Sequence, residues 1–284
     1  MAKQGRPPKK ELIEDYWTDF IKDFVFNQPA FFISSAGRKY CQNIGFSIPG
    51  HAWKNGMDTD VNDLGYHGQT AKMNQLTRNY FNQDAITEAR EKLTSRNDRD
   101  MDFTSVMVPT QAGPKRADSQ GFCMTAIIIS HLGKDSYNPT EKVTVEVLYR
   151  STEITQKFGA DLIFLHDIVL PAIIPPDIMD HLHSVSFHFA NAFFSPLFTP
   201  VLYRLIDPIQ FLEMLSVRVR DKREASMLRS CERAVSLPFT QTDPTYYNYR
   251  TRRIMHEVAI KAVQTGDINT ERAKEYFAKR GLIL

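Results

Sequence analysis

Residues 121–170 contain the feature that most constrains the fold: two β-rich apolar runs followed by a longer apolar stretch. The runs GFCMTAIIISHL and VTVEVLYRS are rich in β-branched residues, and the polar segment GKDSYNPTEK between them has turn chemistry. This order predicts an antiparallel hairpin over residues 121–150. The stretch that follows is long enough for a largely buried helix, which Pro171 and Pro175 are expected to end.

The rest of the chain adds helices and strands on either side of this segment. We expect helices at residues 10–27, within 65–100 and over most of 206–284, and strands at 101–109 and 184–194. An irregular region is expected from residue 28 to about 65. The order predicts an α/β (α+β) domain over residues 11–284, with a mixed sheet packed with helices and a helical C-terminal extension from about residue 206.

Composition narrows the class of protein without identifying it. Hydrophobic residues make up 42% of the 284 residues and the net charge is +2, so nothing in the whole chain argues for nucleic-acid binding. Three cysteines are too few for a disulfide framework, which favours a reducing cytoplasm. We find no apolar run long enough for a membrane span and no signal-peptide pattern, and we expect residues 1–10 to form a disordered basic tail.

Cys123 is the first candidate for chemistry. A single cysteine in an apolar strand is most often a small buried hydrophobe. The predicted hairpin, however, brings Cys123 close to Arg150 and Ser151 at the end of the returning strand. A guanidinium lowers the pKa of a nearby thiol, and arginine with serine can also hold a phosphate.

The order of these residues resembles the thymidylate synthase superfamily, which includes synthases acting on uridylate and hydroxymethylases acting on cytidylate. The matching features are LYRS at 148–151, Glu153 in the acidic place, FG at 158–159 and Asp161 eleven positions after Arg150. Upstream, DLGYHGQ and SRNDRDMDFTSVMVP are similar to two further family segments. The resemblance covers residues 63–195, about half of the chain.

The resemblance implies a role for each matching residue. Cys123 would attack C6 of a pyrimidine, Asp161 would recognise cytosine where synthases carry asparagine, and Glu153 would lie at the cofactor site. The remaining implied substrate-binding residues are Arg150, Ser151, Asn191, Arg99 and, in place of an absent phosphate loop, Arg38. The implied activity is conversion of dCMP to 5-hydroxymethyl-dCMP in a homodimer, with 5,10-methylenetetrahydrofolate as the one-carbon donor.

Departures from the family pattern keep alternatives open. One residue is missing before Arg150, phenylalanine (Phe193) stands in a tyrosine position, and no glutamate-bearing helix is recognisable, although Glu14 is a weak candidate. A uridylate-methylating synthase and a non-catalytic, nucleotide-binding relative are the alternative functions. Asp161 could instead cap a helix. The histidines of DIMDHLHSVSFH predict a polar loop rather than a metal site.

Overall fold

The computed structural model describes the sheet, the helices around it and two C-terminal helices. The described residues are 10–34, 38–59, 81–95, 103–110, 123–133, 140–194, 225–226, 228–229, 249–269 and 271–278. The expected N-terminal tail lies outside these residues, apart from Lys10. So does most of the first helix expected after residue 206.

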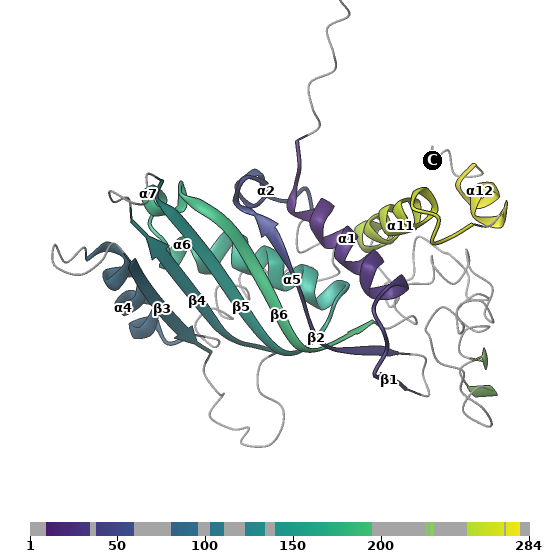
Figure 1. Ribbon diagram of the computed structural model, residues 1–284, viewed down its shortest axis with the longest axis horizontal. Coiled ribbons are helices and arrows are strands. Elements are labelled where there is room, and N and C mark those ends of the chain that lie inside the picture. The colour runs from purple at the N-terminus through teal and green to yellow at the C-terminus, as the bar shows by residue number, and fades with distance from the viewer. Residues whose placement is uncertain are drawn as a thin grey trace, which may run out of the picture.

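Six strands form one mixed sheet in the order β1-β2-β6-β5-β4-β3 (Figure 1). The strands are β1 (Phe32–Ile33), β2 (Lys39–Pro49), β3 (Phe103–Pro109), β4 (Met124–Leu132), β5 (Lys142–Glu153) and β6 (Leu182–Phe194). Strands β5 and β6 are parallel, and every other neighbouring pair is antiparallel. The predicted mixed sheet packed with helices and the predicted β4–β5 hairpin are therefore confirmed.

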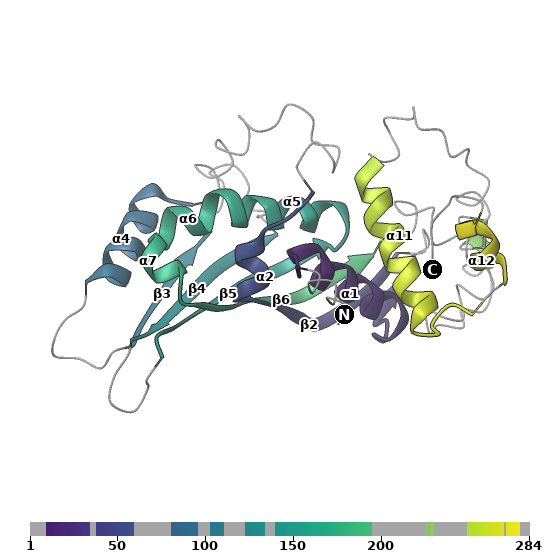
Figure 2. The ribbon, with the colours of Figure 1, turned by 90° about the horizontal axis from the view of Figure 1, so that it is seen from above.

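The described helices are α1 (Ile13–Phe26), α2 (Gly50–Asn55), α4 (Gln83–Thr94), α5 (Gln156–Phe164), α6 (Leu170–Ile173), α7 (Pro176–Met179), α11 (Tyr249–Gln264) and α12 (Glu271–Ala278). Helices α4, α5 and α6 lie along one side of the sheet, whereas α11 and α12 lie past its end (Figure 2). Figure 2 shows α4, α6 and α5 following one another in this order over the sheet, with α1 beside α11. Lys261 of α11 pairs with Asp19 of α1 at 2.9 Å, so α11 is attached to the N-terminal helix.

Alternation along β5 explains how the sheet packs. Val143, Val145, Val147 and Tyr149 are buried, whereas the residues between them are half-buried or exposed. Successive side chains of a strand point to opposite faces, so one face of β5 meets the core and the other does not. The core side contains stacked and edge-on phenylalanine rings, with Phe158 of α5 placed 5.7 Å from the Tyr149 ring.

The expectation of an irregular region over residues 28–65 is wrong, because β2 is an eleven-residue strand within it. Asn43 in this strand has a φ of 51°, and Asn tolerates that left-handed conformation better than most residues. A Cβ added at Gly45 would lie 2.2 Å from the Phe187 carbonyl oxygen of β6, so only glycine fits there. The strand pattern was hard to see because asparagine, glycine and proline are uncommon in strands. In β2 they occur where the backbone conformation or a close contact with β6 requires them.

The expectation that Pro171 ends the helix after β5 is also wrong. A π-helical turn, η1 (Leu165–Val169), joins α5 to α6, and Pro171 lies inside α6. Within this wider turn the Leu170 amide donates to the Leu165 carbonyl five residues earlier. A wide turn gives room for the proline ring, which would clash with the carbonyl four residues back in a regular α-helix.

The turn between β5 and α5 is held by hydrogen bonds from an earlier helix, α1, and to a later strand, β6. The Trp17 indole of α1 donates a hydrogen bond of 2.9 Å to the Ile154 carbonyl, and the Ile154 amide donates to Phe193 of β6 at 3.1 Å. Trp17 is fully buried. Helix α1 and strand β6 therefore fix the point at which the chain leaves the sheet and enters α5.

Trp17→Phe should lower the free energy of unfolding by more than the loss expected from the smaller ring. The Ile154 carbonyl would be left buried without its indole donor, which costs about 1–3 kcal/mol. The measurement is urea unfolding of Trp17→Phe against Trp53→Phe, which shortens another buried tryptophan that packs against His166 and Phe187. Equal loss of stability in both variants would contradict the role given to the Trp17 hydrogen bond.

Candidate functional site

Three chain segments meet where β4 begins and β5 ends. Cys123 directly precedes β4, and its carbonyl accepts a hydrogen bond of 2.8 Å from the Arg150 amide. Met124 stands opposite Tyr149 in the β4–β5 register. Helix α5 starts after a short turn, and Asp161 lies on its second turn. The charged groups of Asp161 and Arg150 both act on the Cys123 thiol, and the Arg150 side chain is exposed on the face of β5 opposite to Tyr149.

The Cys123 thiol is half-buried and surrounded by charged groups. Burial raises the pKa of this thiol, and the neighbouring Asp161 carboxylate raises it further. Lys157 and Arg150 act in the opposite direction and lower it. A thiol in this setting is mainly protonated at rest, and its ionisation depends on which of these neighbours carries charge.

Asp161 has a strongly perturbed carboxyl group. The residue retains some exposed surface, but protein atoms surround its carboxyl group, and loss of hydration raises its pKa from 3.8 to about 7. The nearby Tyr149 hydroxyl can donate a hydrogen bond to the carboxylate, and the Lys157 ammonium attracts it, so both lower the pKa. Such a group exchanges a proton near neutral pH, which is typical of functional sites.

Glu153, the residue predicted to lie at the cofactor site, is a buried carboxylate that caps α5. Its side chain accepts hydrogen bonds from the Thr155 amide at 3.1 Å and the Lys157 amide at 3.2 Å, and from the Thr155 hydroxyl. Only 2% of its surface is exposed. In this arrangement Glu153 holds the start of the helix that bears Asp161.

Ser151 and Asn191 lie side by side on the parallel strands β5 and β6. Both are half-buried. The Asn191 side chain donates to the Arg150 carbonyl at 3.4 Å and accepts from Gln42 of β2 at 3.3 Å. These two candidate substrate-binding residues therefore neighbour Arg150, one residue along β5 and one strand across.

The other predicted substrate-binding residues are less closely placed. Arg38 lies in the β1–β2 turn, two strands away from β5, where its backbone pairs with Ser34. Its Nε is buried without an acceptor among the described residues. Phe193 stacks on Tyr40 at 5.3 Å, and Arg99 lies outside the described part of the chain. Glu14 accepts a hydrogen bond from the Thr59 amide at 2.7 Å.

Sequence reasoning missed Lys157 and Tyr149. Lys157 is four residues before Asp161, so one helical face carries both, but that signal has meaning only once α5 is known to start at Gln156. Tyr149 appeared to be one more apolar residue of the strand. Its hydroxyl is relevant only because α5 folds back over β5.

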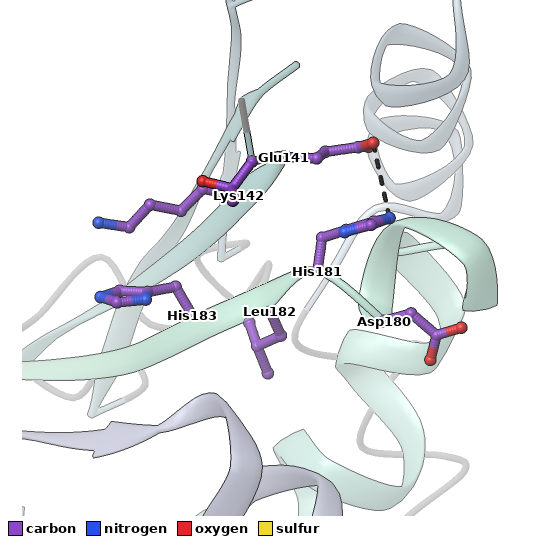
Figure 3. A pocket seen from close by; sticks show the side chains of 7 residues that line it. Glu141, Lys142, Asp180, His181, Leu182 and His183 are labelled. Carbon is purple, nitrogen blue, oxygen red and sulfur yellow. Dashed lines mark ion pairs between the residues drawn. The ribbon is translucent and has the colours of Figure 1, made fainter. Parts of the chain in front are cut away.

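A hollow lies at the opposite end of β5 and β6 from Cys123 (Figure 3). It has a volume of about 690 Å³, and Glu141, Lys142, Asp180 and His181 are among its lining residues. Glu141 accepts from the buried His131 at 2.6 Å and faces His181 at 3.5 Å. Figure 3 shows Lys142 pointing away from this pair, so the polar groups do not converge on one point.

The described residues contain neither a cluster suited to a metal ion nor a helix suited to a membrane. No cluster of histidine, cysteine and acidic side chains suited to a metal ion occurs among them. None of the helices in the described part of the chain has the length and apolar character needed to cross a membrane. In comparisons with known proteins, no family model matches this chain and no curated protein sequence matches it significantly.

Asp161 should make the protein less stable as the pH rises. Its pKa is about 7 in the folded protein and near 3.8 when unfolded, so the folded state binds an extra proton between these values. The resulting stabilisation is complete below about pH 4 and is lost as the pH rises through 7. Asp161→Asn should therefore raise the free energy of unfolding at pH 8 by roughly 1–3 kcal/mol, less than the full shift implies because some surface remains hydrated.

The measurement is urea unfolding between pH 5 and 8, with Asp177→Asn as the control. Asp177 is an exposed residue of α7, so its replacement should leave the pH profile close to wild type. A wild-type stability that does not fall over this range, together with no gain in Asp161→Asn, would contradict the desolvation argument.

Proposed function

We propose that the protein is a pyrimidine-nucleotide C5 hydroxymethyltransferase acting on dCMP. The supporting observation is the meeting of the Cys123 thiol, the Asp161 carboxyl and Arg150 at one end of the sheet. The resemblance assigned these residues a nucleophile, a base-reading group and a phosphate ligand. A reduced thiol is required, so we place the protein in the cytoplasm, with a pyrimidine nucleoside monophosphate as its partner.

Asp161 supports cytosine as the base. Cytosine accepts a hydrogen bond at N3 and donates one from N4, and a protonated carboxyl group donates and accepts in the matching pattern. Uracil has the reverse pattern and would leave a buried polar group unpaired. With a pKa of about 7, Asp161 carries this proton in a large fraction of molecules at neutral pH.

The residues then act in sequence on the nucleotide. Arg150 and Ser151 hold the phosphate, which places the base over Cys123. The ionised Cys123 sulfur forms a bond to C6, and the electron pair of the C5–C6 double bond moves toward C5 and the N3 edge, where Asp161 stabilises it. After C5 gains its substituent and loses its proton, the C6–S bond breaks and the thiolate is released.

The folate donor implied by the resemblance would supply the one-carbon unit. Glu153 fits a direct folate contact poorly here, because it is buried and its carboxylate accepts hydrogen bonds from the start of α5. We therefore derive no step through the donor. The 5,10-methylenetetrahydrofolate requirement is a proposal that tritium release with and without this donor tests, and Glu153 is given no contact with it.

A homodimer is part of this proposal, and the face of the sheet away from the helices supports it. Phe103 and Met107 of β3 are 54% and 63% exposed. They stand opposite Leu132 and Ile128 of β4, which are half-buried. Exposed apolar side chains gathered on a sheet face are typical of a protein interface. A second copy of the chain would cover them.

Binding should distinguish the two bases, and the preference should depend on pH. We expect dCMP to bind at least tenfold more tightly than dUMP at pH 6, and the dCMP affinity to fall as the pH rises through 7, when Asp161 loses its proton. Isothermal titration calorimetry at pH 6 and 8.5 is the measurement. Asp161→Asn should reverse the preference toward dUMP.

Tritium release from [5-³H]dCMP, with and without methylenetetrahydrofolate, tests the covalent step. We expect release in wild type and loss of at least a thousandfold in Cys123→Ser, with Cys41→Ala as a matched control because Cys41 is buried elsewhere. Release that persists without the Cys123 thiol would exclude the covalent mechanism. Equal binding of both nucleotides would exclude the cytosine assignment, tighter binding of dUMP would favour the uridylate-methylating alternative, and binding without tritium release would favour the non-catalytic one.

The dimer should be weakened by a charge on the exposed sheet face. We expect Met107→Lys to shift the protein toward monomer in sedimentation velocity, because a lysine would be desolvated between two copies. Thr87→Lys, which adds the same charge at an exposed position of α4, should leave the wild-type distribution unchanged. A wild-type protein that sediments as a monomer at high concentration would refute the proposal.

A further inference from the structure

Three aromatic side chains form a row across one end of the sheet, on the face away from α5. Phe32 of β1 stands opposite Tyr40 of β2, and Tyr40 stands opposite Phe193 of β6. The centre of the Tyr40 ring lies 5.6 Å from that of Phe32 and 5.3 Å from that of Phe193, on which it stacks. Phe32 is 44% exposed and the other two are half-buried, whereas the alternate residues Cys41 and Phe194 are buried on the core side. This aromatic row is therefore accessible to a partner.

Polar side chains flank the aromatic row on both sides. On one side, Gln42 of β2 stands opposite Asn191 of β6, and its amide donates to the Asn191 side chain at 3.3 Å. On the other side, Arg38 directly precedes β2 and is two residues from Tyr40, so strand alternation places it on the same face. The Arg38 Nε has no hydrogen-bond acceptor among the described residues. The row thus has amide donors and acceptors along one border and a cation at the other.

This combination matches the chemistry of a single-stranded nucleic acid. Unpaired bases stack on aromatic side chains exposed on a sheet, amides bind base edges, and arginine binds phosphate. Three rings in contact offer more stacking surface than one base covers, which favours a strand of several nucleotides over a free nucleotide. An apolar protein surface fits less well, because it would bury Gln42, Asn191 and Arg38 without supplying polar partners for them.

We propose that the aromatic row, together with Arg38, Gln42 and Asn191, binds single-stranded nucleic acid with its bases stacked on the rings. The inference does not rest on the proposed dCMP activity. It is compatible with the proposed dimer, because β2 and β3 are four strand spacings apart in the sheet, roughly 19 Å. The net charge of +2 describes the whole chain, whereas binding here uses the rings and a local cation.

Fluorescence anisotropy with a labelled oligothymidylate of about twelve nucleotides tests this binding at low salt. Thymine lacks the hydrogen-bond pattern that Asp161 is proposed to read, so the probe reports on the sheet rather than on the proposed reaction site. We expect the wild-type protein to bind it and Tyr40→Leu to weaken binding by roughly fivefold or more, because leucine is apolar but offers no ring for stacking. Tyr40→Phe keeps the ring and should bind within about twofold of wild type. Arg38→Gln should weaken binding and lower the slope of log affinity against log salt by about 0.7.

Two controls test whether the effect belongs to this end of the sheet. Phe103→Ala removes an exposed ring from β3, at the opposite edge of the sheet (Figure 1), and should leave the oligothymidylate affinity within about twofold of wild type. Tyr40→Leu should sediment as the wild-type protein does, because the proposed contact between two copies lies on β3 and β4. No binding by the wild-type protein, or unchanged binding in Tyr40→Leu, would overturn the inference. So would a shift of Tyr40→Leu toward monomer, which would assign the aromatic row to the contact between copies.

Competition separates this surface from the proposed reaction site. If both proposals hold, dCMP at a concentration that saturates the reaction site should leave the labelled oligothymidylate bound. Displacement by dCMP would place both ligands at one site and would overturn the inference of a separate surface. If oligothymidylate binds with the expected response to Tyr40→Leu but dCMP does not bind, the inference about the sheet holds and the proposed enzyme does not.

Discussion

The hydrogen bonds between Glu153 and the start of α5 are the interaction on which the site depends. Glu153 ends β5, and its carboxylate accepts from the Thr155 and Lys157 amides. The first amides of a helix have no partners within the helix and carry partial positive charge, so a buried carboxylate is well matched to them. Trp17 holds the next carbonyl, that of Ile154. The direction of α5 and the placement of Asp161 follow from these two contacts.

With α5 fixed in this way, Asp161 is carried into surroundings that do not stabilise its charge. Its pKa of about 7 records that penalty, because the folded protein prefers the protonated carboxyl group. A fold selected only for stability would place an apolar or amide side chain here. The carboxyl group is retained beside a thiol whose own ionisation it opposes, and both features have a simple explanation if a polar ligand binds there.

Sequence reasoning was most successful where local pattern and chain neighbours decide the structure. The β4–β5 hairpin is formed by adjacent segments with a polar turn between them, and α11 follows its helical pattern from Tyr249 to Gln264. Strand β2 was missed because it contains Asn43 and Gly45, which are unusual in strands. Gly45 is required by the close approach of β6, which is about 140 residues away in sequence. Lys157 and Tyr149 were missed for a related reason. Both act on the Asp161 carboxyl group, and that relation exists only once the chain has folded.

The spacing of eleven residues between Arg150 and Asp161 has a physical meaning that the structure makes explicit. Three residues of strand, a turn fixed by Trp17 and Glu153, and one and a half helical turns separate the two side chains. Each residue of an α-helix rotates the side chain by about 100°, so one insertion after the Glu153 cap would turn Asp161 away from Cys123. The interval therefore fixes the side of α5 on which the Asp161 carboxyl group lies, and with it the electrostatic effect of Asp161 on the Cys123 thiol.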